Sequence, residues 1–130
     1  MRKETISSLK KKADAIFSKF IRLRDADWKG EARCFTCAIK KRWQEMDCGH
    51  YEDRGHNSTR YCERNCQIQC KPCNIWRAGR KTIFAVELRK KYGKGILEEL
   101  RKQAEQTKQF TKDELEEIIE RYKRKINDLT

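Results

Sequence analysis

The sequence predicts a mixed α+β protein, with an amphipathic helix at its N-terminal end, a central region stapled by paired cysteines, and about three C-terminal helices. Apolar side chains recur with helical spacing in both outer parts and lose that period in the middle, where the cysteines gather. A length of 130 residues is typical of one domain. We therefore expect a single domain, 1–130, made of an N-terminal helix (1–32), a core (33–81) and a C-terminal helical region (82–130).

The first helix is expected over residues 5–29, because apolar side chains follow one another at steps of three and four between lysines and arginines. Gly30 is expected to end this helix. The stripe that it would bury consists of Ile6, Leu9, Ala13, Ile16, Phe17, Phe20 and Leu23.

Residues 33–74 have no helical period and are rich in cysteine, glycine, asparagine and single aromatic residues, a composition typical of short strands and loops. From Asn74 the chain is expected to be helical for about a turn and a half, until Gly79. A flexible polar loop is expected around residues 55–59, with His56 on the surface.

Three helices are predicted after this core. The first begins near Thr82 and stops at Gly93, and the second carries an apolar face from Ile96 to Ala104. The third begins with a capping box, in which Thr111 accepts a backbone N–H and Glu114 reaches back. Its apolar stripe (Leu115, Ile118, Ile119, Tyr122, Ile126, Leu129) is predicted to pack in the core, with a dimer seam as the alternative.

Charge favours a polyanionic partner. The chain carries 32 Lys and Arg against 20 Asp and Glu, a formal net charge of +12. Half of this excess lies in 33–81, where 11 basic side chains accompany 5 acidic ones. Such concentrated charge attracts nucleic acid, whereas solvated faces usually mix both signs, as 82–130 does. A solubilising surface is the alternative interpretation.

The expected cellular compartment follows from the targeting and membrane-spanning signals that the sequence lacks. No apolar run resembles a signal peptide or reaches membrane-spanning length, so we expect no membrane association. We expect a cytoplasmic protein whose thiols stay reduced, which makes metal binding a better explanation for paired cysteines than disulfides. The odd total of seven cysteines points the same way.

Two C-x-x-C turns predict one structural Zn²⁺ per chain. Cys34 and Cys37 form the first turn, Cys70 and Cys73 the second, and 32 residues separate the turns. Each turn places two thiolates about one tetrahedron edge apart, and four protein ligands close the coordination shell. The alternative is a redox pair or unrelated free thiols. Three further cysteines, Cys48, Cys62 and Cys66, are either buried thiols or, with His50, part of a second metal site.

An ordered set of residues between and around the two turns carries a family resemblance. A histidine between the turns, an asparagine before the second and another directly after its last cysteine resemble the HNH (ββα-metal, His-Me finger) nucleases, and the layout is similar to endonuclease VII of T-even phages. The chain more closely resembles the NinG/Rap recombination-endonuclease family of lambdoid phages, over essentially its whole length. The matching run is Asp47, Gly49-His50-Tyr51, Glu63-Arg64-Asn65, Gln69-Cys70, Cys73-Asn74 and Gly79.

The resemblance implies a ββα-metal core and a site that hydrolyses phosphodiesters. His50 suits the general base, since neutral imidazole is abundant near pH 7. Asn74 would hold Mg²⁺ or Mn²⁺, for which an amide oxygen is a suitable hard ligand. Arg77, three residues on and on the same helix face, would clamp the scissile phosphate. Asn65 matches the middle asparagine of the motif and would orient the His50 loop.

The sequence offers three candidates for the acidic metal ligand. Many HNH enzymes have Asp directly before the histidine, where this chain has Gly49. Asp47 matches the NinG-like pattern, but an offset of three would put it on the other strand face from His50 unless the chain bends. Glu52, which shares the His50 face in a regular strand, and Asp53 are the alternatives, and water in place of any carboxylate is the last.

Basic side chains near the core are the candidate DNA contacts. Lys40, Lys41 and Arg42 precede Trp43, which either stacks on an unpaired base or belongs to the core. Arg80 and Lys81 extend the patch begun by Arg77.

Together these inferences predict a Mg²⁺- or Mn²⁺-dependent, structure-specific DNA endonuclease. The resemblance implies branched recombination intermediates, such as Holliday junctions and D-loops, as substrates during phage recombination in the host cytoplasm. It also suggests a homodimer, since junction DNA has two-fold symmetry, and other recombination proteins as partners. The alternatives are a zinc-knuckle DNA-binding accessory protein without cleavage activity and a metal–thiol redox sensor.

Overall fold

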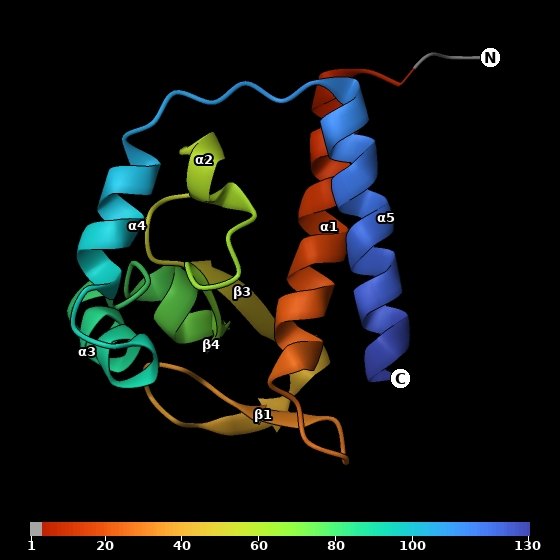
Figure 1. The fold of residues 1–130 in the computed structure, drawn as a ribbon. Coiled ribbons are helices and arrows are strands. Elements are labelled where there is room, and N and C mark those ends of the chain that lie inside the picture. Colours follow the sequence, from red (N-terminus) through yellow and green to blue (C-terminus); the bar gives the residue numbers. More distant parts are fainter. Residues whose placement is uncertain (1–3) are drawn as a thin grey trace.

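The computed structural model describes residues 4–130 and has an α+β architecture (Figure 1). Its elements follow one another along the chain as α1 (Ile6–Arg24), β1 (Glu31–Arg33), β2 (Lys40–Arg42), the 3-10 turn η1 (Trp43–Glu45), β3 (Met46–His50), α2 (Asn57–Arg60), β4 (Cys66–Cys70), the π-helical turn η2 (Pro72–Trp76), α3 (Lys81–Tyr92), α4 (Ile96–Ala104) and α5 (Lys112–Leu129). One helix, a central region with four short strands and three further helices follow one another, which confirms the α+β prediction.

Helices α1 and α5, from opposite ends of the chain, lie side by side and run in the same direction (Figure 1). Near their starts Leu9 and Ala13 of α1 pack on Leu115 and Ile119 of α5. Further along, Phe17 contacts Tyr122 edge to face, with ring centroids 4.9 Å apart. The predicted Thr111 capping box starts α5 as expected. Because the α5 stripe is buried against α1, it is core and not a free dimer seam.

Helix α1 is shorter than predicted. Thr5 caps its start in a capping box with Ser8, but the helix ends at Arg24 and not at residue 29. After it, the Asp27 carboxylate accepts the backbone N–H groups of Lys29 and Glu31, both at 2.9 Å. Aspartate that bonds its own backbone in this way offers the chain an alternative to the helix.

Four short strands form two separate antiparallel ribbons. In the first, β1 pairs with β2, and Arg33 faces Lys40. In the second, β3 pairs with β4 in an unbroken register from Met46 opposite Cys70 to His50 opposite Cys66. The second ribbon lies between α1 and the α3–α4 pair (Figure 1).

Helices α3 and α4 match their predicted bounds and pack on each other through Phe84, Leu88, Ile96 and Leu100, which are all essentially inaccessible to solvent. Phe35 and Tyr51 pack against the same cluster, so this helix pair also covers the first cysteine turn and the end of β3.

The segment after the second cysteine pair differs from the prediction. The helical turn and a half expected from Asn74 is a π-helical turn that already begins at Pro72, with the Arg77 N–H donating to the Pro72 carbonyl at 3.0 Å. Hydrogen bonds that span five residues rotate side chains three apart away from each other, so Asn74 and Arg77 do not share a face as they would in an α-helix. Single π-turns are frequent at functional sites.

The loop predicted around residues 55–59 is partly helical. Asn57–Arg60 form one turn, α2, in which Thr59 is buried. His56 precedes this turn and is exposed, as predicted. Within residues 4–130, no helix combines the length and apolar character needed to cross a bilayer.

The α1–α5 contact generates a stability prediction. Leu115→Ala should lower the free energy of unfolding by about 2–5 kcal/mol, because it empties a fully buried position between the two helices. Leu129→Ala, on the same helix at a side chain 49% exposed, should change it by less than about 0.5 kcal/mol. Urea titration followed by circular dichroism measures both. Equal effects would show that α5 does not dock on α1 as described.

Candidate zinc centre and catalytic pocket

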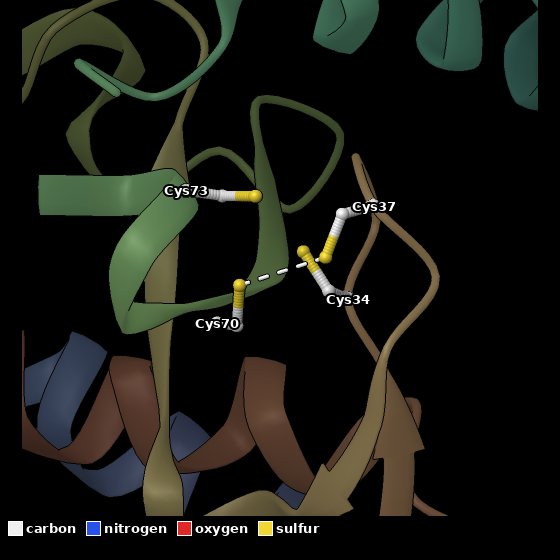
Figure 2. Close-up of side chains that lie close together, drawn as sticks. All are labelled: Cys34, Cys37, Cys70 and Cys73. Carbon is white, nitrogen blue, oxygen red and sulfur yellow. Dashed lines mark hydrogen bonds between the residues drawn. The ribbon is translucent and has the colours of Figure 1, made fainter. Parts of the chain in front are cut away.

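The four predicted zinc ligands converge. The sulfur atoms of Cys34, Cys37, Cys70 and Cys73 all lie within 4.8 Å of one another and point into one space (Figure 2). The Sγ atoms of Cys37 and Cys70 are 3.6 Å apart. In a tetrahedral site with Zn–S bonds of about 2.3 Å, two sulfurs are separated by about 3.8 Å. The cluster therefore fits a zinc ion with four sulfur ligands.

Backbone geometry holds the two turns together. In the first turn the Ala38 N–H donates to the Cys34 carbonyl at 2.9 Å, and Ala38 adopts a left-handed φ of 64°. The Phe35 N–H donates to the Ile68 carbonyl at 2.8 Å, which ties this turn to β4. Cys70 ends β4 and Cys73 lies in η2, so the second pair is fixed by the ribbon itself.

The thiols of this cluster differ in acidity. Burial raises the pKa of Cys34, but hydrogen bonds from Thr36 and from nearby backbone groups outweigh it and lower the pKa to about 6. Burial raises the pKa of Cys70 to about 12 and also raises that of Cys37. Binding of a cation by all four sulfurs must therefore release protons.

A cavity of about 620 Å³ opens between α1, β3, α2 and the η2 turn, and Asn74, the residue after Cys73, lines it. Its lining includes four of the predicted site residues, Asp47, His50, Asn74 and Lys81. Asp47 and His50 border the same cavity although the β3–β4 register is regular and has no bulge. Two-stranded ribbons twist more strongly than wide sheets, which lets side chains three positions apart face one hollow.

His50 is held in one orientation by a backbone contact. Its Nε2 lies 3.0 Å from the carbonyl oxygen of Arg60. Because a carbonyl only accepts, Nε2 carries the proton and the lone pair of the neutral ring is on Nδ1. Burial lowers the pKa of His50 below its ordinary value. The ring is therefore neutral near pH 7, the state that a general base requires.

The carbonyl that orients His50 is itself fixed by an ion pair. Asp14, on α1, accepts hydrogen bonds from Arg60 Nε at 2.8 Å, from Arg60 Nη2 at 2.5 Å and from the Tyr61 hydroxyl at 2.9 Å. Burial raises the pKa of Asp14, but these donors outweigh it and the net shift is downward. Asp14 is therefore ionised, and it anchors α2 to the first helix.

Asp47 and Asn74 meet at the other side of the cavity. Asn74 Nδ2 donates to Asp47 Oδ2 at 3.1 Å, which leaves the Asn74 amide oxygen free. Lys71 Nζ donates to Asp47 Oδ1 at 2.7 Å, from a side chain that is more than half exposed. The pair thus offers hard oxygen atoms, the donors that Mg²⁺ and Mn²⁺ prefer, beside the exposed ammonium group of Lys71.

Asn65 lies beneath the pocket and is completely buried. Its Nδ2 donates to the carbonyls of Glu52 at 3.0 Å and Thr59 at 3.2 Å, and its Oδ1 accepts from the Glu52 N–H at 2.8 Å. Lys81 Nζ adds bonds to the carbonyls of His50, at 2.5 Å, and Tyr51. Both side chains therefore hold the loop that follows His50.

Close packing explains why position 49 is a glycine. A Cβ atom there would lie 2.0 Å from the Oε1 of Gln69, a fully buried side chain held by Thr36 and by the Gly79 carbonyl. A carboxylate directly before His50 does not fit this packing.

Gln67, on the same strand as Gln69, is also fully buried, and its side-chain amide forms hydrogen bonds with Arg24, Tyr92 and Lys91.

Several predicted site residues lie outside the cavity lining. Arg77 follows η2 and is exposed, and Arg80 has a buried Nε without a partner. Lys40, Lys41 and Arg42 lie on β2, where Lys40 pairs with Asp27. Trp43 packs against the buried apolar residues around Met46, and the Arg22 guanidinium group lies over its ring. Trp43 therefore belongs partly to the core. Of the alternative carboxylates, Asp53 lines the cavity and Glu52 does not.

The sequence analysis missed the contributions of α1 and α2. Asp14 and Ser18 line the cavity from α1, and Arg54, Arg60 and Tyr61 line it from the loop and turn after β3. The only local signal was a carboxylate beside the apolar stripe of a basic helix, which by itself indicates a solvated face.

The whole chain, residues 1–130, matches the family model for the bacteriophage lambda NinG protein. The chain belongs to the NinG family. Over 120 residues it is 30% identical to the NinG proteins of Escherichia phage 933W and Escherichia phage lambda, and 29% identical to that of Salmonella phage P22. Each alignment covers 92% of this chain but only 56–57% of the relative, so the chain spans little more than half the length of these NinG proteins. No solved structure matches it.

The zinc centre generates the second prediction. Cys70→Ser should abolish stoichiometric zinc binding and lower the melting temperature sharply, because zinc binding at such sites contributes about 10–16 kcal/mol in small zinc domains. Cys62→Ser, outside the cluster, should keep one zinc per chain and the melting temperature of the unsubstituted protein. Atomic emission and thermal denaturation measure the two properties. A Cys70→Ser protein that keeps both the zinc content and the melting temperature of the unsubstituted protein would exclude the four-sulfur site.

Proposed function

We propose that the protein is a metal-dependent DNA endonuclease of the HNH type, with β3, β4 and η2 as its ββα-metal unit. The observation that carries this proposal is the convergence of His50, Asp47 and Asn74 on one cavity beside the four-cysteine cluster. Membership of a phage family agrees with it. The names of these relatives state no activity, so the proposed chemistry rests on the residues of this chain.

Asp47 and Asn74 would hold the catalytic Mg²⁺ or Mn²⁺. Their oxygen atoms suit a hard cation, and Lys71 would exchange its contact with Asp47 for one with phosphate as the cation binds. The bound cation would stabilise the charge that builds on the scissile phosphate. Zinc would remain structural, since four sulfur ligands leave no position for water or substrate.

His50 would remove the proton from the attacking water. The Arg60 carbonyl holds the Nε2 proton, so the lone pair on Nδ1 is the base. The Asp14–Arg60 pair positions that carbonyl, which makes Asp14 a positioning residue. The lowered pKa of His50 keeps the base available down to mildly acidic pH.

Basic and aromatic side chains near the cavity would bind the DNA. Arg54 lines the cavity with a largely exposed guanidinium group, and Arg77 is exposed just beyond η2. Trp76, next to Arg77, is 82% exposed, which suits stacking on an unpaired base. The displaced strand of a D-loop carries unpaired bases, so this surface would suit one class of the branched recombination intermediates suggested by the resemblance. A homodimer and recombination partners stay predictions.

His50→Ala should reduce the rate of metal-dependent DNA cleavage by at least about 100-fold, the usual contribution of a general base. His56→Ala, at the exposed histidine before α2, should cleave at the rate of the unsubstituted protein. The assay incubates labelled four-way junction and linear duplex DNA with Mg²⁺, Mn²⁺ or EDTA. Binding of junction DNA without any nicking would favour the alternative, a zinc-bearing accessory protein.

Asn74→Ala should abolish cleavage while the protein retains one zinc per chain, because Asn74 faces Asp47 and not the sulfur cluster. Ile75→Ala, at the exposed neighbouring position, is the matched control and should keep both properties. Cleavage at full rate by Asn74→Ala would remove this residue from the metal site, and loss of zinc would assign it to the fold.

A further inference from the structure

A second group of metal-ligand side chains lies beside the proposed general base. One ligand atom each from Cys48, His50 and Cys66 lies within 4.8 Å of the other two. None of the three belongs to the four-cysteine cluster. Among residues 4–130, three or more histidine, cysteine or carboxylate ligands approach so closely in two places: in this group and in the four-cysteine cluster.

The β3–β4 register creates this group. Cys48 and His50 are two residues apart on β3 and so project from the same face of the strand. Cys66 is the direct cross-strand partner of His50 in the ladder. Side chains opposite each other in an antiparallel pair have Cβ atoms about 4.5–5.5 Å apart. Two thiols and one imidazole are thus brought together by the same pairing that holds the nuclease core.

Ligand chemistry distinguishes this group from Asp47 and Asn74. Thiolate and imidazole select zinc and similar soft cations, whereas carboxylate and amide oxygens select Mg²⁺ and Mn²⁺. Three protein ligands leave the fourth position of a tetrahedral ion open. Cys48 and His50 both line the cavity, so an ion from solution can reach the group although Cys66 is buried.

We propose that Cys48, His50 and Cys66 form a second, soft-metal site, and that Zn²⁺ bound there inhibits cleavage because His50 then holds a metal ion and not the proton of the attacking water. The inhibition rests on the proposed nuclease function, whereas the binding of the metal does not. One site would prefer hard cations and its neighbour soft ones. The protein would then cleave DNA with Mg²⁺ or Mn²⁺ and be inhibited by free Zn²⁺.

Binding is tested on the full chain, purified with one zinc and kept reduced with a phosphine that does not bind metal. The protein is titrated with Zn²⁺ against a chromophoric chelator, and a second equivalent is expected. Cys48→Ser and Cys66→Ser should each weaken this second equivalent by at least about tenfold, the lower range for disturbing a metal site. Cys62→Ser, a nearby cysteine outside the group, is the matched control and should bind the second equivalent normally.

Cobalt gives an independent readout. Co²⁺ added to the one-zinc protein should produce the near-ultraviolet absorbance of cobalt–thiolate bonds, and Cys66→Ser should reduce it while Cys62→Ser should not. A spectrum unchanged by Cys48→Ser and by Cys66→Ser would assign the added metal to other thiols and overturn the proposal. Failure of the unsubstituted protein to bind a second equivalent of Zn²⁺ would overturn it as well.

The inhibition of cleavage is tested in a separate experiment. Cleavage in Mg²⁺ should fall at least tenfold when the second zinc equivalent binds, and Cys66→Ser should cleave in Mg²⁺ but resist this inhibition. Cleavage that persists with the second site filled would overturn the regulatory part. If no condition gives cleavage but a second zinc binds to Cys48 and Cys66, then the proposed nuclease function fails while the soft-metal site stands.

Discussion

The pairing of β3 with β4 is the constraint on which both candidate sites depend. Five residue pairs connect Met46, opposite Cys70, with His50, opposite Cys66. One end of this ribbon enters the four-cysteine cluster, and the other end presents His50 to the cavity, about 14 Å away at the usual rise per residue. A register shift of one residue would turn every side chain to the other face and separate both sites. Zinc bound at one end would therefore hold the geometry of the other.

The helices protect this short ribbon. Two strands alone are marginally stable in water, and here α1 packs on β3 and β4 while α5 covers the far side of α1. Arg24, at the end of α1, donates to the carbonyls of Glu63 and Cys66 at 3.0 Å, which fixes the start of β4. Asp14, ten residues earlier, anchors Arg60. The first helix is therefore part of the support of the candidate site and not a mere extension.

Prediction from the sequence succeeded where the signal is local. The capping box at Thr111, the bounds of α3 and α4, and the meeting of the two C-x-x-C turns each depend on residues close together in the chain or on one ion's geometry. It failed where another interaction competes with the helical pattern: α1 ends at Arg24, before the segment in which Asp27 bonds its own backbone, and η2 is a π-turn that separates Arg77 from the face of Asn74. Which of Asp47, Glu52 and Asp53 border the cavity also depends on the twist of the ribbon, which the sequence does not display.

By itself, the sequence determined the four cysteines of the candidate zinc centre, the basic charge of the core and the order of the helices, because each follows from residue type and spacing. Only the tertiary structure decided how the two cysteine pairs relate to the cavity. It placed Asp47 and Asn74 in contact, gave His50 its carbonyl partner, and brought Cys48 and Cys66 to the same histidine. These contacts join residues up to 27 positions apart, and strand register and helix packing, not local propensity, set such distances.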